Sequence, residues 1–267
     1  MNVVQLHERV RFWVDIVSST RFESEDIDNA LNVASDNKVR ESYDKGRFMN
    51  KSDAFQKVQR IRDELGPIVK KLTEGSGLAI SSDLITIDSD ISYRYMLSIR
   101  AKFGLSGWHP CFPLTYNRKN VVERNPYRRV RTTPVSKVYY NEDTNGINIS
   151  HNIPTALDDA EIYYLADPAI INYGIEYSSS KTFTDGDVVY AVEETVYGGV
   201  TYKIGDAITI SAPTLSITSG LVVFDYVDCD IRASTHEEIS RRGAYSCLIT
   251  AGEIDKANQL MQEIMAS

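Results

Sequence analysis

The chain has 267 residues and a net charge of −8, with 42% hydrophobic and 25% charged residues. This composition is that of an ordinary globular protein, so it excludes wholesale disorder, a coiled coil and a collagen-like fibre. The length allows one large domain or two modest ones, and the negative charge opposes nonspecific nucleic-acid binding by the chain as a whole. Tyrosine is the unusual residue: its 16 copies suit surfaces that are apolar at one end and wet at the other.

Helical periodicity marks the beginning of the chain. Residues 2–18 place Val3, Leu6, Val10, Trp13 and Val17 on one helical stripe, which predicts a first helix. A second helix is expected to start at an N-cap, Ser24, with acidic residues in its first turn. A third is expected from Ser52 to about Leu72, where Pro67 should kink the helix or restart it.

The period changes to two from about residue 78. Apolar and polar residues alternate between Tyr93 and Phe103, which predicts a half-buried strand, and only Met96 breaks the pattern. Glycines and prolines then recur over residues 104–136, which predicts a long irregular surface segment. Further strands are expected at 137–140 and 147–149, joined by a hairpin at Asn145-Gly146, and at 161–165.

Residues 173–226 have the pattern of a separate small β module, because short strands alternate with turn signals such as Gly198-Gly199. Helical periodicity returns at residue 234, with two overlapping capping boxes at Ser234 and Thr235. This helix should end at Gly252, and a last helix should follow.

The order of helices, strands and helices predicts an α+β fold. We expect a helical body made by the N-terminal and C-terminal helices, central β strands and a small inserted β sandwich or barrel. The expected parts are an N-terminal helical part at 1–78, a central β region with a long surface arm at 79–172, an accessory β module at 173–226, and C-terminal helices at 227–267 that pack on the N-terminal ones.

The three cysteines, Cys111, Cys229 and Cys247, lie far apart in the sequence. An odd, widely spaced set favours neither a disulfide scaffold nor a zinc site, so we expect a reducing compartment. We also expect no cofactor. Charged residues interrupt the N-terminal apolar pattern, and no run of 18 apolar residues occurs. We therefore expect neither a signal peptide nor a membrane span.

Candidate metal ligands are few. Residues 141–146 match the start of a calcium loop, but Asn152 stands where a bidentate Glu is required, which favours a hairpin turn. His109 and Cys111 lie close together without further ligands at a suitable spacing. We expect no metal site.

Candidate catalytic residues are also few. The common hydrolase, nucleotide-binding and zinc-protease motifs are absent. The pairs Asp88/Asp90 and Asp185/Asp187 lie beside predicted strand ends, where turn chemistry explains them more simply than acid–base catalysis. We expect a protein that is not an enzyme, with an enzyme built on a carboxylate pair as a remaining hypothesis.

One charge cluster stands out in this acidic chain. Between residues 118 and 137, seven basic residues and one acidic residue give a net charge of +6. Contact with DNA phosphates or with an acidic partner surface is the functional interpretation, and a solvated loop is the alternative. The basic residues are Arg118, Lys119, Arg124, Arg128, Arg129, Arg131 and Lys137.

Three segments of the sequence form a recognisable set. The first is residues 19–32, STRFESEDIDNALN, which follow the first helix. The second is Asn125-Pro126-Tyr127-Arg128-Arg129, and the third is residues 235–239, THEEI, which open the closing helix. In these segments the chain resembles bacteriophage head-to-tail connector or neck proteins, especially ring proteins of short-tailed, crAss-like phages. The β module at 173–226 is not part of the pattern.

This resemblance implies a virion structural protein, made in the cytoplasm of a bacterial host. It would be one subunit of a ring, twelve-fold by expectation, stacked between portal and tail so that DNA passes through the centre. Its partners would be its own copies, the portal and other neck or tail proteins, with sequence-independent contact to genomic DNA and no membrane. The alternative is a carbohydrate- or surface-binding β module protein of the virion, in which Tyr-rich strands at 173–226 present aromatic faces to a glycan.

Overall fold

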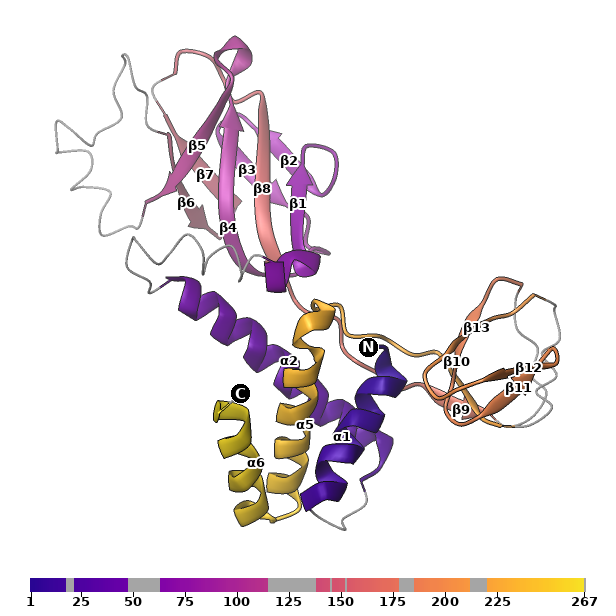
Figure 1. The fold of residues 1–267 in the computed structure, drawn as a ribbon. Helices are drawn as coiled ribbons and strands as arrows, with labels where there is room; N and C mark the ends of the chain where they lie inside the picture. Colours follow the sequence, from indigo (N-terminus) through magenta and orange to yellow (C-terminus); the bar gives the residue numbers. More distant parts are fainter. Residues whose placement is uncertain are drawn as a thin grey trace. The chain divides into compact units, whose positions relative to one another are not determined.

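The computed structural model describes residues 1–17, 22–47, 63–114, 138–144, 146–151, 153–177, 185–211 and 220–266. The chain divides into two compact units. One combines Met1–Pro67 with Pro168–Ser267, and the other is Ile68–Asp167. Helices occupy both ends of the chain and strands its middle (Figure 1), so the predicted α+β class is confirmed.

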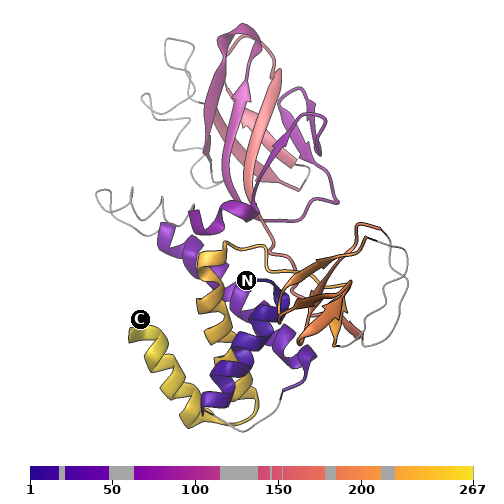
Figure 2. The same ribbon diagram turned by 45° about the vertical axis from the view of Figure 1, so that its right-hand side comes forward.

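In the described part of the first unit, four α-helices form the helical body. Helices α1 (Val3–Val17) and α2 (Ser24–Arg47) come from the start of the chain, and α5 (His236–Thr250) and α6 (Ile254–Ala266) come from its end. Figure 1 and Figure 2 both show α5 beside α1 and α2, with α6 folded back along α5. The two ends of the sequence therefore build one core together.

Gly243 on α5 allows this close packing. A Cβ atom at Gly243 would lie 3.2 Å from Leu31 Cδ2 on α2 and 3.4 Å from Val10 Cγ2 on α1. Both neighbours are completely buried, so they have little room to move. Other completely or almost completely buried apolar side chains of these helices are Leu6, Val14, Ile27, Ile239 and Leu248.

Charged side chains add a second tie between α2 and α5. Lys38 Nζ lies 2.6 Å from Glu238 Oε2 and 3.6 Å from Glu64 Oε2. Arg242 donates two hydrogen bonds, of 2.9 and 3.0 Å, to the carboxylate of Glu41. Lys38 is only 8% exposed, so its ammonium group has lost most of its contact with water. The carboxylates of Glu238 and Glu64 compensate for this loss.

The third predicted helix is wrong over its last part. Residues 63–65 are helical, but a 3-10 turn, η1 (Gly66–Ile68), follows at Pro67, and strand β1 (Val69–Thr73) replaces the expected continuation. Proline disfavours helical geometry in the residue before it, and β1 gains a full antiparallel partner in strand β8. The expected start of this helix, from Ser52 to residue 62, lies outside the described residues.

The predicted capping boxes of the closing helix are also wrong. A 3-10 turn, η3 (Ala233–Thr235), precedes α5, and the Thr235 hydroxyl donates to the Arg232 carbonyl at 2.7 Å instead of capping the helix. Gly252 has a φ of +80° and its N–H bonds to the Ile249 carbonyl, which confirms the predicted helix end.

The second unit is a single curved sheet of eight strands, in the order β1-β8-β4-β5-β6-β7-β3-β2. All neighbouring pairs are antiparallel except β5 and β6. The outermost strands, β1 and β2, are joined by a turn at residues 74–77, so the sheet curves round an enclosed core (Figure 1). Its remaining strands are β2 (Leu78–Ser81), β3 (Leu84–Ile87), β4 (Tyr93–Lys102), β5 (Trp108–Pro113), β6 (Val138–Asp143), β7 (Gly146–Ser150) and β8 (Asp159–Ala166).

Several strand predictions for this sheet are confirmed. Strand β4 has the predicted bounds within a residue, and its register against β8 shifts between Met96 and Ser98. A β-bulge of this kind explains why Met96 breaks the alternation, because it turns the side chain to the other face. The hairpin of β6 and β7 is also present, with Gly146 at a φ of +134°. Asn145 and Asn152 lie outside the described residues.

The irregular segment predicted for residues 104–136 is wrong at its start. A short 3-10 turn, η2 (Gly104–Ser106), leads directly into β5, which lies inside the sheet between β4 and β6. Pro110 and Pro113 both belong to this strand. Proline is depleted from interior strands because it lacks an N–H donor, so the sequence favoured a loop here. Residues 115–137 lie outside the described part of the chain.

The small β module belongs to the same compact unit as the helical body. A four-stranded sheet has the order β13-β10-β14-β9, and strands β11 and β12 form a separate hairpin. Tyr197 and Tyr202 of that hairpin pack on the apolar core of the four-stranded sheet, so the module is a small sandwich. Its strands are β9 (Ile175–Tyr177), β10 (Val188–Ala191), β11 (Thr195–Tyr197), β12 (Val200–Tyr202), β13 (Ala207–Thr209) and β14 (Val222–Phe224).

Asp228 connects the module to the start of α1. Its Oδ1 accepts the backbone N–H of Val3 at 2.7 Å, and its Oδ2 accepts the Tyr190 hydroxyl of β10 at 3.0 Å. Asn2 adds a 2.7 Å hydrogen bond to the carbonyl of Gly205. A carboxylate at a helix N-terminus also interacts favourably with the helix dipole, so Asp228 stabilises both partners.

Candidate functional site

The seven basic residues predicted as a contact, Arg118, Lys119, Arg124, Arg128, Arg129, Arg131 and Lys137, all lie outside the described residues. Their role remains a prediction. Within the described part of the chain, two surfaces of α1 carry the strongest chemical features. One adjoins α5 and the other adjoins α2.

Beside α5, α1 carries an aromatic–arginine cluster made by Arg9, Phe12, Trp13, Glu237 and Arg241. The carboxylate of Glu237 accepts hydrogen bonds from Arg9 Nε at 2.8 Å, Trp13 Nε1 at 3.2 Å and Arg241 Nε at 3.3 Å. The Arg241 guanidinium lies 4.6 Å from the Trp13 ring, and that of Arg9 lies 5.0 Å from the Phe12 ring. These are cation–π distances, so both guanidinium groups are held against rings.

Glu237 is the electrostatic centre of the cluster. Partial burial acts to raise its pKa, but hydrogen bonds and charge from Arg9 and then Arg241 outweigh that effect, and its pKa is lowered. The same hydrogen bond raises the pKa of Arg9. The carboxylate is therefore ionised and already occupied by donors, so the cluster offers a new partner N–H donors and ring surface.

Phe12 makes this cluster an unusual surface. Its side chain is 48% exposed, although the neighbouring Trp13 is partly covered by the two arginines. Trp, Phe and Arg are enriched in the buried centres of protein interfaces, where a few such residues carry most of the binding energy. The composition of the cluster is thus typical of a protein contact.

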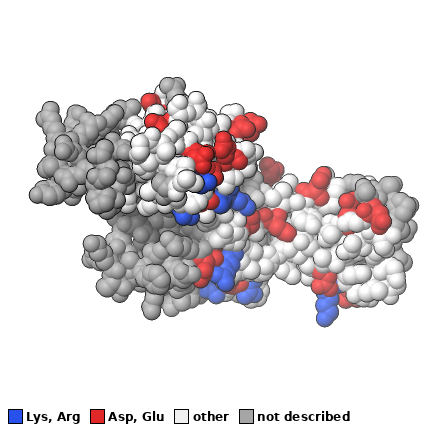
Figure 3. Space-filling model, turned by 90° about the horizontal axis from the view of Figure 1, so that it is seen from above, with Lys and Arg blue, Asp and Glu red and all other residues white. Residues whose placement is uncertain are grey.

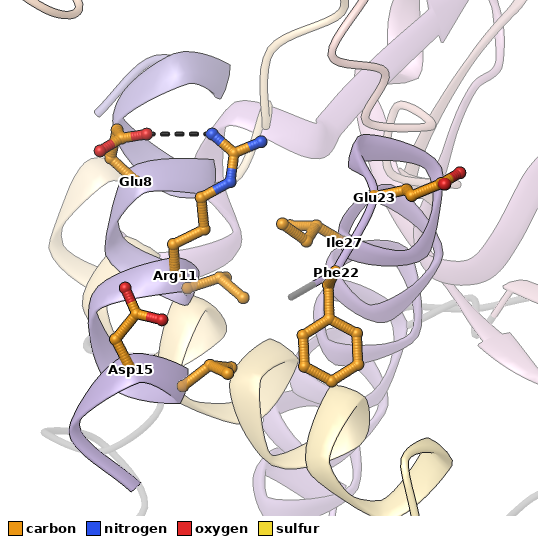
Figure 4. A pocket seen from close by; sticks show the side chains of 8 residues that line it. Glu8, Arg11, Asp15, Phe22, Glu23 and Ile27 are labelled. Atoms are coloured by element: carbon orange, nitrogen blue, oxygen red, sulfur yellow. Dashed lines mark hydrogen bonds and ion pairs between the residues drawn. The ribbon is translucent and has the colours of Figure 1, made fainter. Parts of the chain in front are cut away.

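Beside α2, α1 forms one wall of an acidic groove of about 660 Å³ (Figure 4). The groove is lined by Glu8, Val10, Arg11, Val14, Asp15, Phe22, Glu23 and Ile27. Figure 4 shows Arg11 and Asp15 projecting from α1 and Ile27 projecting from α2 toward α1. Glu8 and Asp15 line the α1 side of a floor made by the buried Val10, Val14 and Ile27, and Glu23, whose carboxylate points away from α1 in Figure 4, lines the α2 side.

Arg11 does not neutralise the groove. Its Nη1 lies 3.0 Å from Glu8 Oε1, so its charge is already paired, and its Nη2 donates to Ser24 Oγ at 3.4 Å. Asp15 and Glu23 are both exposed and have no ion-pair partner among the described residues. The groove lining contains no histidine, cysteine or serine, so it offers carboxylates and apolar surface but no nucleophile with a base.

A buried histidine–aspartate pair lies deeper in the same unit. His7 Nε2 is 2.8 Å from Asp28 Oδ1, and both Asp28 oxygens accept the backbone N–H of Tyr173 at 3.0 Å. Such a pair can act as a general base when a substrate reaches it, but His7 is 0% exposed. Burial lowers the pKa of His7 despite the hydrogen bond with Asp28. The pair therefore holds α1, α2 and the segment before β9 together.

The two aspartate pairs singled out in the sequence lie in or next to turns. Asp88 and Asp90 form a turn, in which the Asp90 N–H donates to Asp88 Oδ1 at 3.3 Å, and Gly186 between Asp185 and Asp187 has a φ of +93°. The described residues contain no cluster of three or more side chains suited to a metal ion. Burial raises the pKa of Cys111 to about 12, so its thiol is a poor nucleophile at neutral pH.

The tyrosines of the small β module are mostly used inside it. Tyr177, Tyr197 and Tyr202 pack against the module core. The rings of Tyr190 and Tyr226 contact each other, with centroids 4.4 Å apart. A glycan platform needs ring faces that are open to solvent, so these contacts reduce the support for the carbohydrate-binding alternative.

A scan against protein-family models finds no match for the chain, and a search of curated proteins finds no similar sequence. No helix in the described part of the chain combines the length and the apolar character that crossing a membrane requires. Function is therefore inferred from the side chains of the helical body and from the sequence.

Proposed function

We propose that the protein is a structural subunit of a ring in the neck of a bacteriophage virion, placed between portal and tail so that the genome passes through its centre. Twelve copies are the expected number. The role is structural, not catalytic. The proposal comes from the resemblance of the three sequence segments, and one structural observation supports it: the aromatic–arginine cluster.

The cluster lies at one of those segments. Residues 235–239 open α5, and Glu237 within them organises Arg9, Trp13 and Arg241. A solvent-exposed Phe12 beside two aligned arginines has no evident benefit for folding of the single chain. Burial against a neighbouring subunit would remove its apolar surface from water, and a closed ring needs such contacts between unlike faces of successive copies.

Self-association tests this proposal. The purified full chain should form closed rings in negative-stain images and a matching mass by mass photometry. Phe12→Ser should fold normally and weaken ring formation at least about tenfold, because a buried aromatic anchor is lost. Val33→Ser is the matched control, since Val33 on α2 is 52% exposed. A monomeric wild-type chain that is also missing from phage particles would contradict the proposal.

Contact with DNA is tested separately. Replacing Arg128, Arg129 and Arg131 together by Ser should weaken binding of linear double-stranded DNA of any sequence and flatten the salt dependence, because phosphate contacts carry no base information. The control removes three exposed cations elsewhere, at Arg40, Lys70 and Lys203. Equal loss in both variants would reduce the effect to net charge.

A further inference from the structure

The acidic groove between α1 and α2 holds two carboxylates that no cation among the described residues neutralises. Glu8 is paired with Arg11, whereas Asp15 on α1 and Glu23 just before α2 remain exposed at its rim (Figure 4). Asp15 lies in the last turn of α1, where the helix dipole disfavours a carboxylate, and it also repels Glu23 slightly. A cationic partner would convert this cost into attraction.

The apolar part of the groove narrows the chemistry of that partner. Val10, Val14 and Ile27 form the floor, and Phe22 lies beside it. A simple inorganic cation gains nothing from such a floor. Arginine and lysine gain from it, because their aliphatic stems cover apolar surface while their charged ends reach carboxylates, and an arginine also stacks on an aromatic ring.

The chain itself contains a segment with this chemistry. Residues 118–137 carry a net charge of +6 in a protein whose total is −8, and Pro126 and Tyr127 lie among the basic residues. This segment combines several cations with apolar and aromatic side chains. It is thus complementary to the groove in both charge and polarity.

We infer that the acidic groove of one copy binds the basic segment 118–137 of a second copy. This inference rests on the proposed ring, because a closed ring requires two unlike complementary surfaces on each subunit. The groove and the basic segment are such a pair, and both are present on every copy. Asp15 and Glu23 bind the cations, while Phe22 and the floor bind apolar parts of the segment.

A second acidic surface provides a matched control. The small β module, residues 173–226, has seven acidic and two basic residues. Figure 3 shows several of its acidic groups, on the right of the view. Glu193 and Glu194 are exposed there. Reversing their charges changes the net charge of the chain by as much as reversing Asp15 and Glu23, but leaves the groove intact.

The probe is a labelled peptide of residues 118–137, and the receptor is the full chain with Arg128, Arg129 and Arg131 replaced by Ser, so that its own segment competes less. Fluorescence anisotropy should show binding that weakens as salt rises from about 0.05 to 0.5 M. Adding Asp15→Lys and Glu23→Lys to the receptor should weaken binding at least about tenfold, and Glu193→Lys with Glu194→Lys should change it less than about threefold.

The decisive experiment measures ring formation by the intact protein. Asp15→Lys/Glu23→Lys should abolish ring formation of the otherwise unchanged chain, and adding Arg128→Glu/Arg129→Glu should restore it in part by exchanging the charges. Circular dichroism checks that each variant is folded.

Rings that form normally when the charges of the groove are reversed would overturn this inference and leave the proposed function standing. Peptide binding lost only in the Glu193/Glu194 variant would place the contact on the small β module and also overturn it. A wild-type chain without rings would count against the proposed function, and peptide binding would then still test the groove.

Discussion

The imidazole of His7 lies almost flat against the phenol ring of Tyr173, with ring centroids 4.4 Å apart and an interplanar angle of 29°. This contact joins the first helix to the segment that leads into the small β module. Asp28 on α2 completes it by accepting hydrogen bonds from both residues. Three distant parts of the sequence thus meet around one buried titratable group.

Stability should therefore depend on pH. Burial lowers the pKa of His7 and of His236 below the ordinary value of 6.5. The unfolded chain then binds protons more readily than the folded one, so the stability is complete above pH 6.5 and is lost as the pH falls from there toward the lowered folded pKa values. Urea unfolding between about pH 8 and 5 measures this loss.

A matched variant isolates the contribution of His7. Gln at position 7 keeps a donor for Asp28 but does not titrate, so His7→Gln should reduce the slope of unfolding free energy against pH. Glu237, whose pKa is lowered from 4.5, acts in a more acidic range and does not interfere. An unchanged slope in His7→Gln would assign the pH dependence to other groups.

Gly243 should tolerate little added volume. Gly243→Val places branched carbons against Leu31 and Val10, so we expect a loss of about 2 kcal/mol or more in the free energy of unfolding. Gly66→Ala is the control, because a Cβ atom there would meet nothing within 4 Å. Equal effects of the two changes, measured by urea denaturation, would show that helix packing at Gly243 is not close.

Lys38 should be more important than any exposed lysine. Lys38→Met keeps the aliphatic stem but leaves Glu238 and Glu64 without their shared cation, and we expect a loss of about 2 to 3 kcal/mol. Lys71→Met breaks an exposed pair with Glu161, which solvent screens, and should lower the stability much less. Thermal unfolding of both variants compares them, and similar midpoints would contradict the expectation.

The small β module should be removable. Ile175 and Phe224 are cross-strand partners, so a short Gly/Ser linker can replace residues 175–224 without moving the ends of the cut. Asp228 keeps its bond to Val3 in the shortened chain. We expect the helices to remain folded, measured by amide hydrogen exchange of α1 and α5, and loss of protection in both helices would show that the module completes their core.

Local patterns predicted much of this fold. The stripe through Val10 identified α1, and the Gly198-Gly199 dipeptide identified the turn between β11 and β12. Met96 was an exception to the alternation in the sequence, but the β-bulge that explains it is seen only in the pairing of β4 with β8. Strand β1 was missed because residues 69–73 also fit a helical stripe, and its state is decided by pairing with β8, some 90 residues later. Such a choice depends on tertiary contacts, not on local propensity.

The two surfaces of α1 were harder to predict. Arg9 and Glu237 are 228 residues apart in the sequence, so their contact leaves no local signal. For the groove a signal existed: Glu8 and Asp15 flank the apolar positions Val10 and Val14, and Phe22 with Glu23 follows shortly afterwards. It went unused because acidic residues beside a helical stripe usually mark only a solvated face.

The eight-stranded sheet is encoded between the two parts of the sequence that form the helical body, and this order affects how the chain folds. Lys38 and Glu238 are 200 residues apart, so α2 and α5 form a contact of high sequence separation, which slows folding when the intervening chain is loose. The eight-stranded sheet, however, begins and ends at neighbouring positions, because Val69 is the cross-strand partner of Leu165. Once the sheet has folded, the flexible chain between Lys38 and Glu238 is shorter by about half, so the entropy cost of closing this loop is smaller. During synthesis all eight strands of this sheet precede α5, so the sheet can fold first. The folded sheet then keeps the two halves of the helical body close together in space when α5 is made.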